Sequence, residues 1–174
     1  MMRTLIVLTL GAALLTAGEA DARFTRASSL NCSVYAQLDR RCGCAGADGY
    51  LIGYGRKYCE RVLRSTGWSA AGLRWRDRTL SCLKEELAHE LAKSPRACDC
   101  AKIGAFAFDS HVRCYTAKPA SVCALPLSDI RKIYQIIDAP DLVDPAGVKQ
   151  MLGVALSCVW QNGNAGARPD DPAR

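Results

Sequence analysis

Apolar residues recur at spacings of three and four along most of this chain, which is the period of an amphipathic α-helix. The clearest stripe predicts a helix that is capped by Asp77 or Thr79 and ends near Lys93. Its apolar positions are Leu80, Leu83, Leu87 and Leu91. Residues 58–65 predict a shorter helix. The glycine-rich segment 31–59 favours turns and short helices.

Three further helices are expected after the break at Ser94-Pro95. The first covers 99–115 and carries on one face Ile103, Phe106, Ala107, Ser110 and Cys114. Ser128 caps the second, over 129–137, whose inward positions are Ile130, Ile133 and Ile137. Asp144-Pro145 starts the last helix, with apolar positions at Val148, Leu152, Ala155 and Val159. No stretch alternates with a period of two for long enough to predict a sheet.

The two ends of the chain differ from this helical part. Residues 1–22 have the organisation of a secretory signal peptide, with Arg3, an apolar run over 5–15 and an Ala-x-Ala site before Arg23. Residues 161–174 are polar and contain two prolines, so we expect a disordered tail there. We therefore expect a secreted, extracellular protein without a membrane span, whose single domain covers 23–160.

Cysteine usage adds cross-links to this picture. Ten cysteines lie downstream of the leader, and an even number in an exported chain predicts up to five disulfides. The 152 residues that follow the leader are enough to bury a sizeable core. The expected fold is therefore all-α, a single disulfide-stapled domain of about four or five main helices.

Charge adds a candidate surface. The chain has a formal net charge of +6, and its basic residues crowd into 56–78. This stretch makes a sulfated glycan or an acidic lipid headgroup a candidate ligand, against the alternative of a solvated helix face. Its basic and aromatic members could contact a partner protein: Arg64, Trp68, Arg74, Trp75 and Arg76. In the alternative that we prefer, both tryptophans fill a seam between two helices. The chain has no nucleic-acid recognition motif.

The order of the cysteines resembles that of the stanniocalcins, a family of secreted, helical, cysteine-rich glycoprotein hormones. The resemblance covers about 32–158 and rests on short motifs with a characteristic order. These are Arg41-Cys42-Gly43-Cys44, Asp48-Gly49-Tyr50 before Cys59, Thr79-Leu80-Ser81-Cys82-Leu83, Cys98, Cys114-Tyr115, and the long separation of Cys123 from Cys158. The family joins two chains through a further cysteine near its C-terminus. No cysteine follows Cys158, so we expect a monomer or a non-covalent homodimer.

The resemblance also implies a set of disulfides. The clearest are Cys42–Cys59, Cys82–Cys114 and Cys123–Cys158, and the early cluster should cross-link to Cys98. Cys44–Cys98 with Cys32–Cys100 completes the set that we expect. The rival is Cys32–Cys44 with a pair between Cys98 and Cys100, because sequence alone does not fix the connectivity of ten cysteines.

Other chemistries have weaker support. The C-x-C pairs at 42–44 and 98–100 could form a zinc site, but zinc ligands prefer wider gaps, so we expect no metal and no cofactor. Asp109-Ser110-His111 weakly resembles the His–Asp pair of secreted phospholipases A2. However, Asp109 and His111 are two residues apart and face different sides of a helix, and no calcium loop matches. Asn31-Cys32-Ser33 is an N-glycosylation acceptor.

We therefore expect a non-catalytic, stanniocalcin-like signalling protein. The resemblance implies a role in calcium and phosphate homeostasis and the binding of an extracellular receptor or of secreted proteins, including a metalloprotease. Two alternatives are a small secreted phospholipase A2-like hydrolase centred on His111, and a secreted effector or defence protein that shares only the scaffold.

Overall fold

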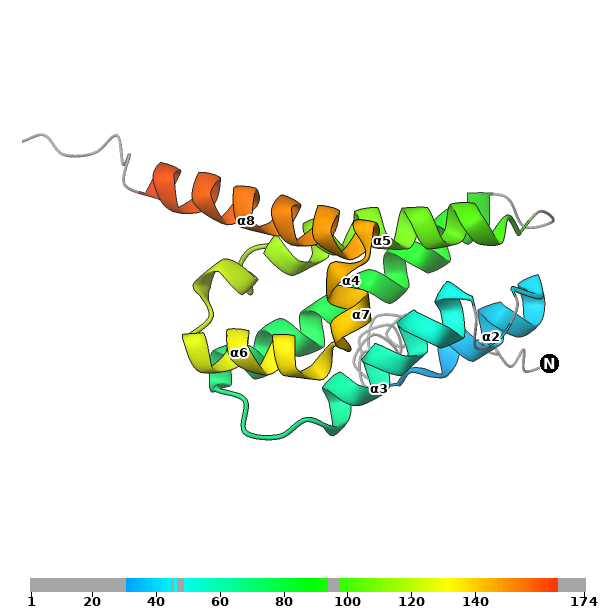
Figure 1. Cartoon of the computed structure of the whole chain (residues 1–174), viewed down its shortest axis with the longest axis horizontal. Coiled ribbons are helices and arrows are strands. Elements are labelled where there is room, and N and C mark those ends of the chain that lie inside the picture. Colours follow the sequence, from blue (N-terminus) through cyan, green and yellow to red (C-terminus); the bar gives the residue numbers. More distant parts are fainter. Residues whose placement is uncertain (1–30, 45, 47–48, 94–97, 166–174) are drawn as a thin grey trace, which may run out of the picture.

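The computed structural model describes residues 31–44, 46, 49–93 and 98–165 (Figure 1). The expected leader and the first residues of the mature chain lie outside this part. The described residues form helices and connecting turns, without a strand. Five disulfides join them, so the all-α, disulfide-stapled class is confirmed.

Two long helices form the centre of the fold. α4 (Ala70–Lys93) packs along α5 (Cys100–Thr116), and α8 (Pro145–Ala165) covers α5 from the other side (Figure 1). The predicted apolar faces of α4 and α5 are confirmed, since Leu87 and Cys114 are almost fully buried. Asp99 caps α5, because its carboxylate accepts a hydrogen bond from the Lys102 backbone N–H.

The shorter elements pack around this pair. α2 (Ser33–Cys42) and the π-helical turn η2 (Tyr50–Arg56) contact each other, and η2 continues into α3 (Lys57–Arg64). The 3₁₀ turn η3 (Val122–Ala124) leads to α6 (Leu127–Ile136), which lies against α3. The short α7 (Ala139–Val143) connects α6 to α8. Gly43 ends α2 in the left-handed conformation, which glycine adopts without steric cost.

The start of α4 differs from the prediction. The helix begins at Ala70, well before Asp77 and Thr79, because Ser69 and a distant carboxylate cap it. The Ser69 hydroxyl accepts a hydrogen bond from the Gly72 N–H, and the buried Asp129 carboxylate accepts bonds from the Ser69 N–H and hydroxyl. A Cβ on Gly72 would lie 2.4 Å from Asp129 Oδ2, so only glycine allows this approach. α6 likewise begins at Leu127, ahead of the predicted cap Ser128.

The last helix differs from the prediction in two ways. It starts at Pro145 as expected, and Asp144 accepts a hydrogen bond from the Ala146 N–H. It continues to Ala165, into the segment predicted to be disordered, while residues 166–174 lie outside the described part. Moreover, its four predicted apolar positions all lie on the exposed face: Val148, Leu152, Ala155 and Val159.

The disulfide pattern corrects part of the expected connectivity. Cys82–Cys114 joins α4 to α5 and Cys123–Cys158 joins η3 to α8, as the resemblance implied. The other bridges differ from Cys42–Cys59, Cys44–Cys98 and Cys32–Cys100, and also from the rival set. The observed pairs are Cys32–Cys59, Cys42–Cys98 and Cys44–Cys100.

The geometry of α2 explains the correction. Cys32 and Cys42 stand at opposite ends of this helix, about 15 Å apart along its axis. Cys59 lies 5.9 Å from Cys32 between Cα atoms, so it is out of reach of Cys42. At the other end, the two C-x-C segments run beside each other and form two neighbouring bridges, with Cα separations of 5.2 and 5.4 Å.

Candidate functional site

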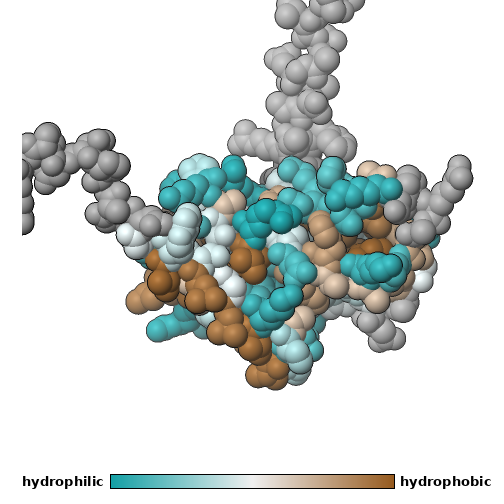
Figure 2. All heavy atoms as spheres, turned by 90° about the horizontal axis from the view of Figure 1, so that it is seen from above, coloured by the Kyte–Doolittle hydropathy of each residue, from teal (hydrophilic) through white to brown (hydrophobic). Residues whose placement is uncertain are grey.

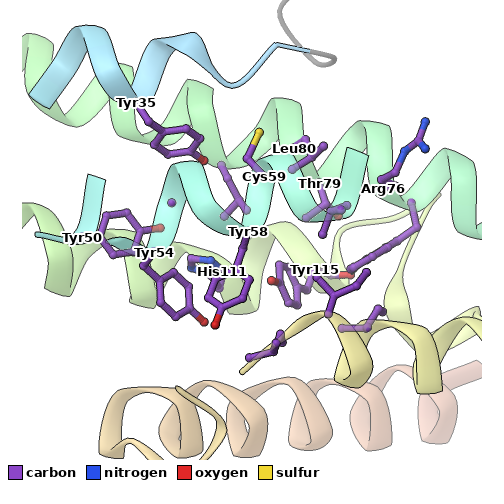
Figure 3. A pocket seen from close by; sticks show the side chains of 17 residues that line it. Tyr35, Tyr50, Tyr54, Tyr58, Cys59, Arg76, Thr79, Leu80, His111 and Tyr115 are labelled. Carbon is purple, nitrogen blue, oxygen red and sulfur yellow. The ribbon is translucent and has the colours of Figure 1, made fainter. Parts of the chain in front are cut away.

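An aromatic cluster surrounds His111 where η2, α3 and α5 meet. Tyr50 and Tyr54 of η2 pack against Phe108 and His111 of α5, and Tyr58 of α3 packs edge-on against Tyr54 (Figure 3). Phe108 packs edge-on against Tyr54, with 4.7 Å between ring centroids. Sequence reasoning missed this cluster, although the i, i+4 repeat of tyrosines was a signal for it.

The cavity inside the cluster is small. It encloses about 50 Å³ and is lined by tyrosine rings, His111 and aliphatic side chains of α4 and α6 (Figure 3). Ligand sites in proteins usually have volumes of about 300–1,000 Å³. A space of this size holds at most a few water molecules, so the cluster serves as a packed core.

His111 itself is fixed as a neutral side chain. It is 3% exposed, and its Nδ1–H donates to the Ala107 carbonyl oxygen over 2.6 Å. Burial lowers the pKa of His111 to about 4, although the bond to Ala107 acts in the opposite direction. Phe108 stacks on the ring and Tyr115 packs against its edge. A buried imidazole with this pKa is poorly suited to general-base catalysis near neutral pH.

The neighbours of His111 do not assemble into a catalytic group. Ser110 donates its hydroxyl to the same Ala107 carbonyl oxygen. Asp109 is exposed, and its carboxylate pairs with Lys149 of α8 at 2.8 Å. The structure therefore places Asp109 and His111 on different sides of α5, as the spacing predicted.

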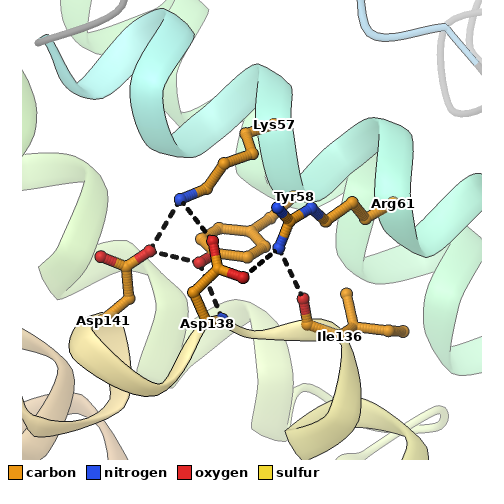
Figure 4. A network of polar contacts seen from close by, with 6 residues as sticks. All are labelled: Lys57, Tyr58, Arg61, Ile136, Asp138 and Asp141. Atoms are coloured by element: carbon orange, nitrogen blue, oxygen red, sulfur yellow. Dashed lines mark hydrogen bonds and ion pairs between the residues drawn. The ribbon is translucent and has the colours of Figure 1, made fainter.

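A polar network lies beside the aromatic cluster and joins α3 to the end of α6, to Asp138 and to α7 (Figure 4). Lys57 pairs with Asp141 at 2.8 Å and with Asp138 at 3.2 Å. Arg61 pairs with Asp138 at 2.6 Å and also donates to the Ile136 carbonyl oxygen. The Tyr58 hydroxyl donates to Asp141 and accepts a bond from the Asp138 backbone N–H. All these partners are distant in sequence, so no local pattern predicted the network.

The network shifts the ionisation of its members. The bonds from Arg61 and Lys57 hold the pKa of Asp138 below its usual value. Burial alone would raise the pKa of Asp141, but the bonds from Lys57 and Tyr58 outweigh it and lower the pKa. Both carboxylates therefore stay charged in mildly acidic solution and keep α3 attached.

The expected partner surface is only partly available. Trp68 and Trp75 are buried, and the Trp75 indole N–H donates to the Tyr115 carbonyl oxygen. The two rings pack 6.0 Å apart in a core with Val122, so the preferred alternative, a seam between helices, is confirmed. Arg76 lies mostly buried beside Asp77, whereas Arg64 and Arg74 are exposed.

Ion pairs neutralise much of the basic stretch. Besides Lys57 and Arg61, both Arg56 and Arg64 pair with Glu60. Exposed arginines that already have acidic neighbours attract a polyanion less than a bare cluster does. This arrangement favours the solvated-face alternative over glycan binding.

The last two candidates from the sequence are the zinc site of the C-x-C segments and the glycosylation acceptor Asn31. The cysteines of both C-x-C segments form disulfides, and the described residues contain no group of three side chains suited to a metal ion. Asn31 is exposed, and its side-chain oxygen accepts the Ser33 N–H. Glycosylation at Asn31 stays a prediction.

An exposed apolar face is the largest surface feature that the sequence analysis missed. α8 and α6 border a groove of about 370 Å³, whose lining includes Leu127, Tyr134 and Met151. Figure 2, which shows the molecule from above Figure 1, displays hydrophobic residues as a continuous brown band on this face. The signal was present in the sequence, because α8 carries apolar residues around more of its circumference than one buried face needs.

The comparisons with known proteins add no relative: the chain matches no protein-family model, no curated protein and no solved structure. Within the described residues, no helix has both the length and the apolar character needed to cross a bilayer.

Proposed function

We propose that this chain is a secreted, non-catalytic signalling protein of the stanniocalcin type, which acts by binding other extracellular proteins. The five disulfides support an extracellular location, because such bridges persist in oxidising compartments. They tie the main helices into a fixed scaffold, which suits a protein that presents a preformed surface to a partner.

The state of His111 is the observation that carries the non-catalytic part of the proposal. The hydrolase alternative needs a histidine that can take a proton from water near neutral pH. His111 is buried, its Nδ1–H is engaged by Ala107, and burial lowers its pKa to about 4. Its cavity of about 50 Å³ has no room for a lipid ester.

A first experiment tests the hydrolase alternative directly. The purified, oxidised protein is incubated with calcium and phospholipid vesicles, and fatty-acid release is measured. We expect release at the level of a protein-free blank. Release that His111→Gln abolishes, with an unchanged circular dichroism spectrum, would contradict the proposal.

A second experiment tests partner binding through the exposed arginines. Labelled protein is added to cells of the source organism, and saturable binding is measured with and without excess unlabelled protein. We expect Arg64→Glu/Arg74→Glu to lower binding at least about tenfold, because charge reversal at a protein contact is unfavourable. Lys102→Glu/Lys118→Glu is the matched control, since both lysines are exposed elsewhere. An equal loss in the control would indicate only general charge attraction.

The role in calcium and phosphate homeostasis that the resemblance implies suggests a measurement of the cellular response. If the proposed relationship holds, bound protein should change the uptake of calcium or phosphate by the same cells. Reduced and alkylated protein, which lacks the disulfides of the scaffold, is the negative control.

A further inference from the structure

The outer face of α8 carries an unusual exposed apolar surface. Val148 is 39% exposed and Leu152 60%, and the exposed fractions rise to 70–72% for Leu156, Val159 and Trp160. The opposite face of the same helix already packs on the core, with Gly153 against Val112 and Cys158 bridged to Cys123. The outer residues therefore have no role in the fold of the described chain.

The spacing of this outer face is that of a helix-pairing seam. Val148, Leu152, Ala155 and Val159 follow one another at intervals of four, three and four residues, the a/d pattern of coiled coils. Such a pattern over three turns keeps one narrow stripe facing a second helix that crosses at a shallow angle.

We propose that this seam is the interface of a homodimer, in which α8 pairs antiparallel with α8 of a second copy. The seam is self-complementary when it is reversed about a point between Gly153 and Val154. Val148 then meets Val159 of the second copy, and Leu152 meets Ala155. Each large side chain at the centre thus faces a small one, which allows the two helices to interdigitate.

The area of the face agrees with a second copy. The exposed side chains of α8 present on the order of 600 Å², against roughly 800 Å² that each partner contributes to a standard interface. Leu127 and Tyr134, at 85% and 49% exposure on the neighbouring α6, can supply the remainder. A two-fold interface uses the same patch twice, so one chain provides both halves.

Charge favours the same occupant and the antiparallel direction. Lys149 is the single charged residue in Pro145–Ala165. Lys149 pairs with Asp109 of its own chain at 2.8 Å. A parallel pair would place the two Lys149 side chains side by side, whereas the antiparallel register separates them along the two helices and so weakens their repulsion. One lysine also gives little attraction to anionic lipid, which argues against a membrane as the occupant.

The first test is the mass of the intact, oxidised protein by sedimentation equilibrium over 1–100 µM, a range that we choose to span weak dimers. We expect a dimer that Leu152→Glu weakens at least about 100-fold, because two carboxylates would be buried near the two-fold axis. Leu73→Glu is the matched control, since Leu73 is a 40% exposed leucine on α4, outside the proposed seam, and the substitution should leave the dimer intact. Val159→Glu serves as a second seam variant if Leu152→Glu fails to fold.

The second test addresses direction and register. Leu152→Glu and Ala155→Lys should each be monomeric alone, but a mixture of the two should form a heterodimer, because the antiparallel register places the introduced carboxylate of one chain beside the introduced ammonium group of the other. Failure of the mixture to associate would overturn the antiparallel pairing. A wild-type monomer at all concentrations would overturn the proposal, and so would binding of that monomer to neutral phosphatidylcholine vesicles, which would assign the face to a membrane.

Discussion

The helices around Leu51 and Leu87 and those around Trp68 and Val122 form two apolar cores, and different interactions hold them together. Three disulfides with cysteines in or against the first core join the two ends of α2 to α3 and to the start of α5. A fourth, Cys82–Cys114, joins α4 to α5. Around the second core one bridge, Cys123–Cys158, works together with polar contacts to Asp129, Asp138 and Asp141. The first core is also the more fully buried of the two.

The comparison shows that disulfides constrain mainly the first core, whereas non-covalent polar contacts constrain mainly the second. A disulfide limits the unfolded chain and is insensitive to mild acid or salt. The ion pairs of Asp138 and Asp141 act only while both partners stay charged. We therefore expect the second core to respond to pH and to single polar substitutions, and the first to respond to loss of its bridges.

The largest effect should come from removing both C-x-C bridges. Cys42–Cys98 and Cys44–Cys100 each span a sequence separation of 56 and close nearly the same loop. Replacing all four cysteines by alanine should cost about 4 kcal/mol of unfolding free energy, while Cys44→Ala/Cys100→Ala alone should cost less than about 1 kcal/mol. Urea unfolding measures both. A cost for the double variant of about half that of the quadruple variant would mean that the bridges act independently.

His111, between the two cores, should make stability depend on pH. Its folded pKa is about 4 because of burial, against about 6.5 when unfolded, so the unfolded state binds more protons between these values. The contribution of neutral His111 should be fully present above pH 7. The free energy of unfolding should then fall by about 3 kcal/mol as the pH drops to 4. Urea unfolding of wild type and His111→Gln at pH 7, 5.5 and 4 checks this. The same slope in the variant would assign the loss to other groups.

Asp129→Ala tests the polar cap of the second core. The substitution leaves the Ser69 N–H and hydroxyl without their buried acceptor, so we expect a loss of about 2–3 kcal/mol. Trp68 and Trp75 lie beside this cap, so their fluorescence reports the unfolding transition. Asp109→Ala, an exposed carboxylate on α5, is the matched control. A loss no larger than that of the control would show that the cap contributes little.

The smallest effect should come from the network at α3. Asp138→Asn weakens the pairs with Arg61 and Lys57, which are partly exposed, so we expect a melting temperature lower by only a few degrees. The lowered pKa of Asp138 means that its contribution is present above about pH 4 and is lost in stronger acid. Calorimetry at pH 6 and pH 2.5 should show a difference that disappears at the lower pH. A constant difference would rule out the charge as its cause.

Local patterns predicted much of the fold. The leucine stripe of α4 and the inner face of α5 were legible because helical spacing and burial coincide there. The seam position of Trp68 and Trp75 and the separation of Asp109 from His111 also followed from the sequence. By contrast, the cap at Ser69 depends on Asp129, sixty residues away. The polar network at Lys57 likewise depends on Asp138 and Asp141, about eighty residues away. Contacts between residues this far apart produce no periodic pattern in the sequence, so hydrophobic spacing could not predict them.

The sequence by itself determined that the chain is helical and that its ten cysteines can form five bridges. Both the spacing of apolar residues and the even number of cysteines can be read from the chain without its fold. The tertiary structure decided which cysteines meet, since pairing requires Cα atoms within about 4.4–6.8 Å and α2 separates Cys32 from Cys42. It also decided which side of α8 faces the core. That helix has apolar residues on two faces, and the close approach of Gly153 to Val112 turns Leu152 and Val159 outward.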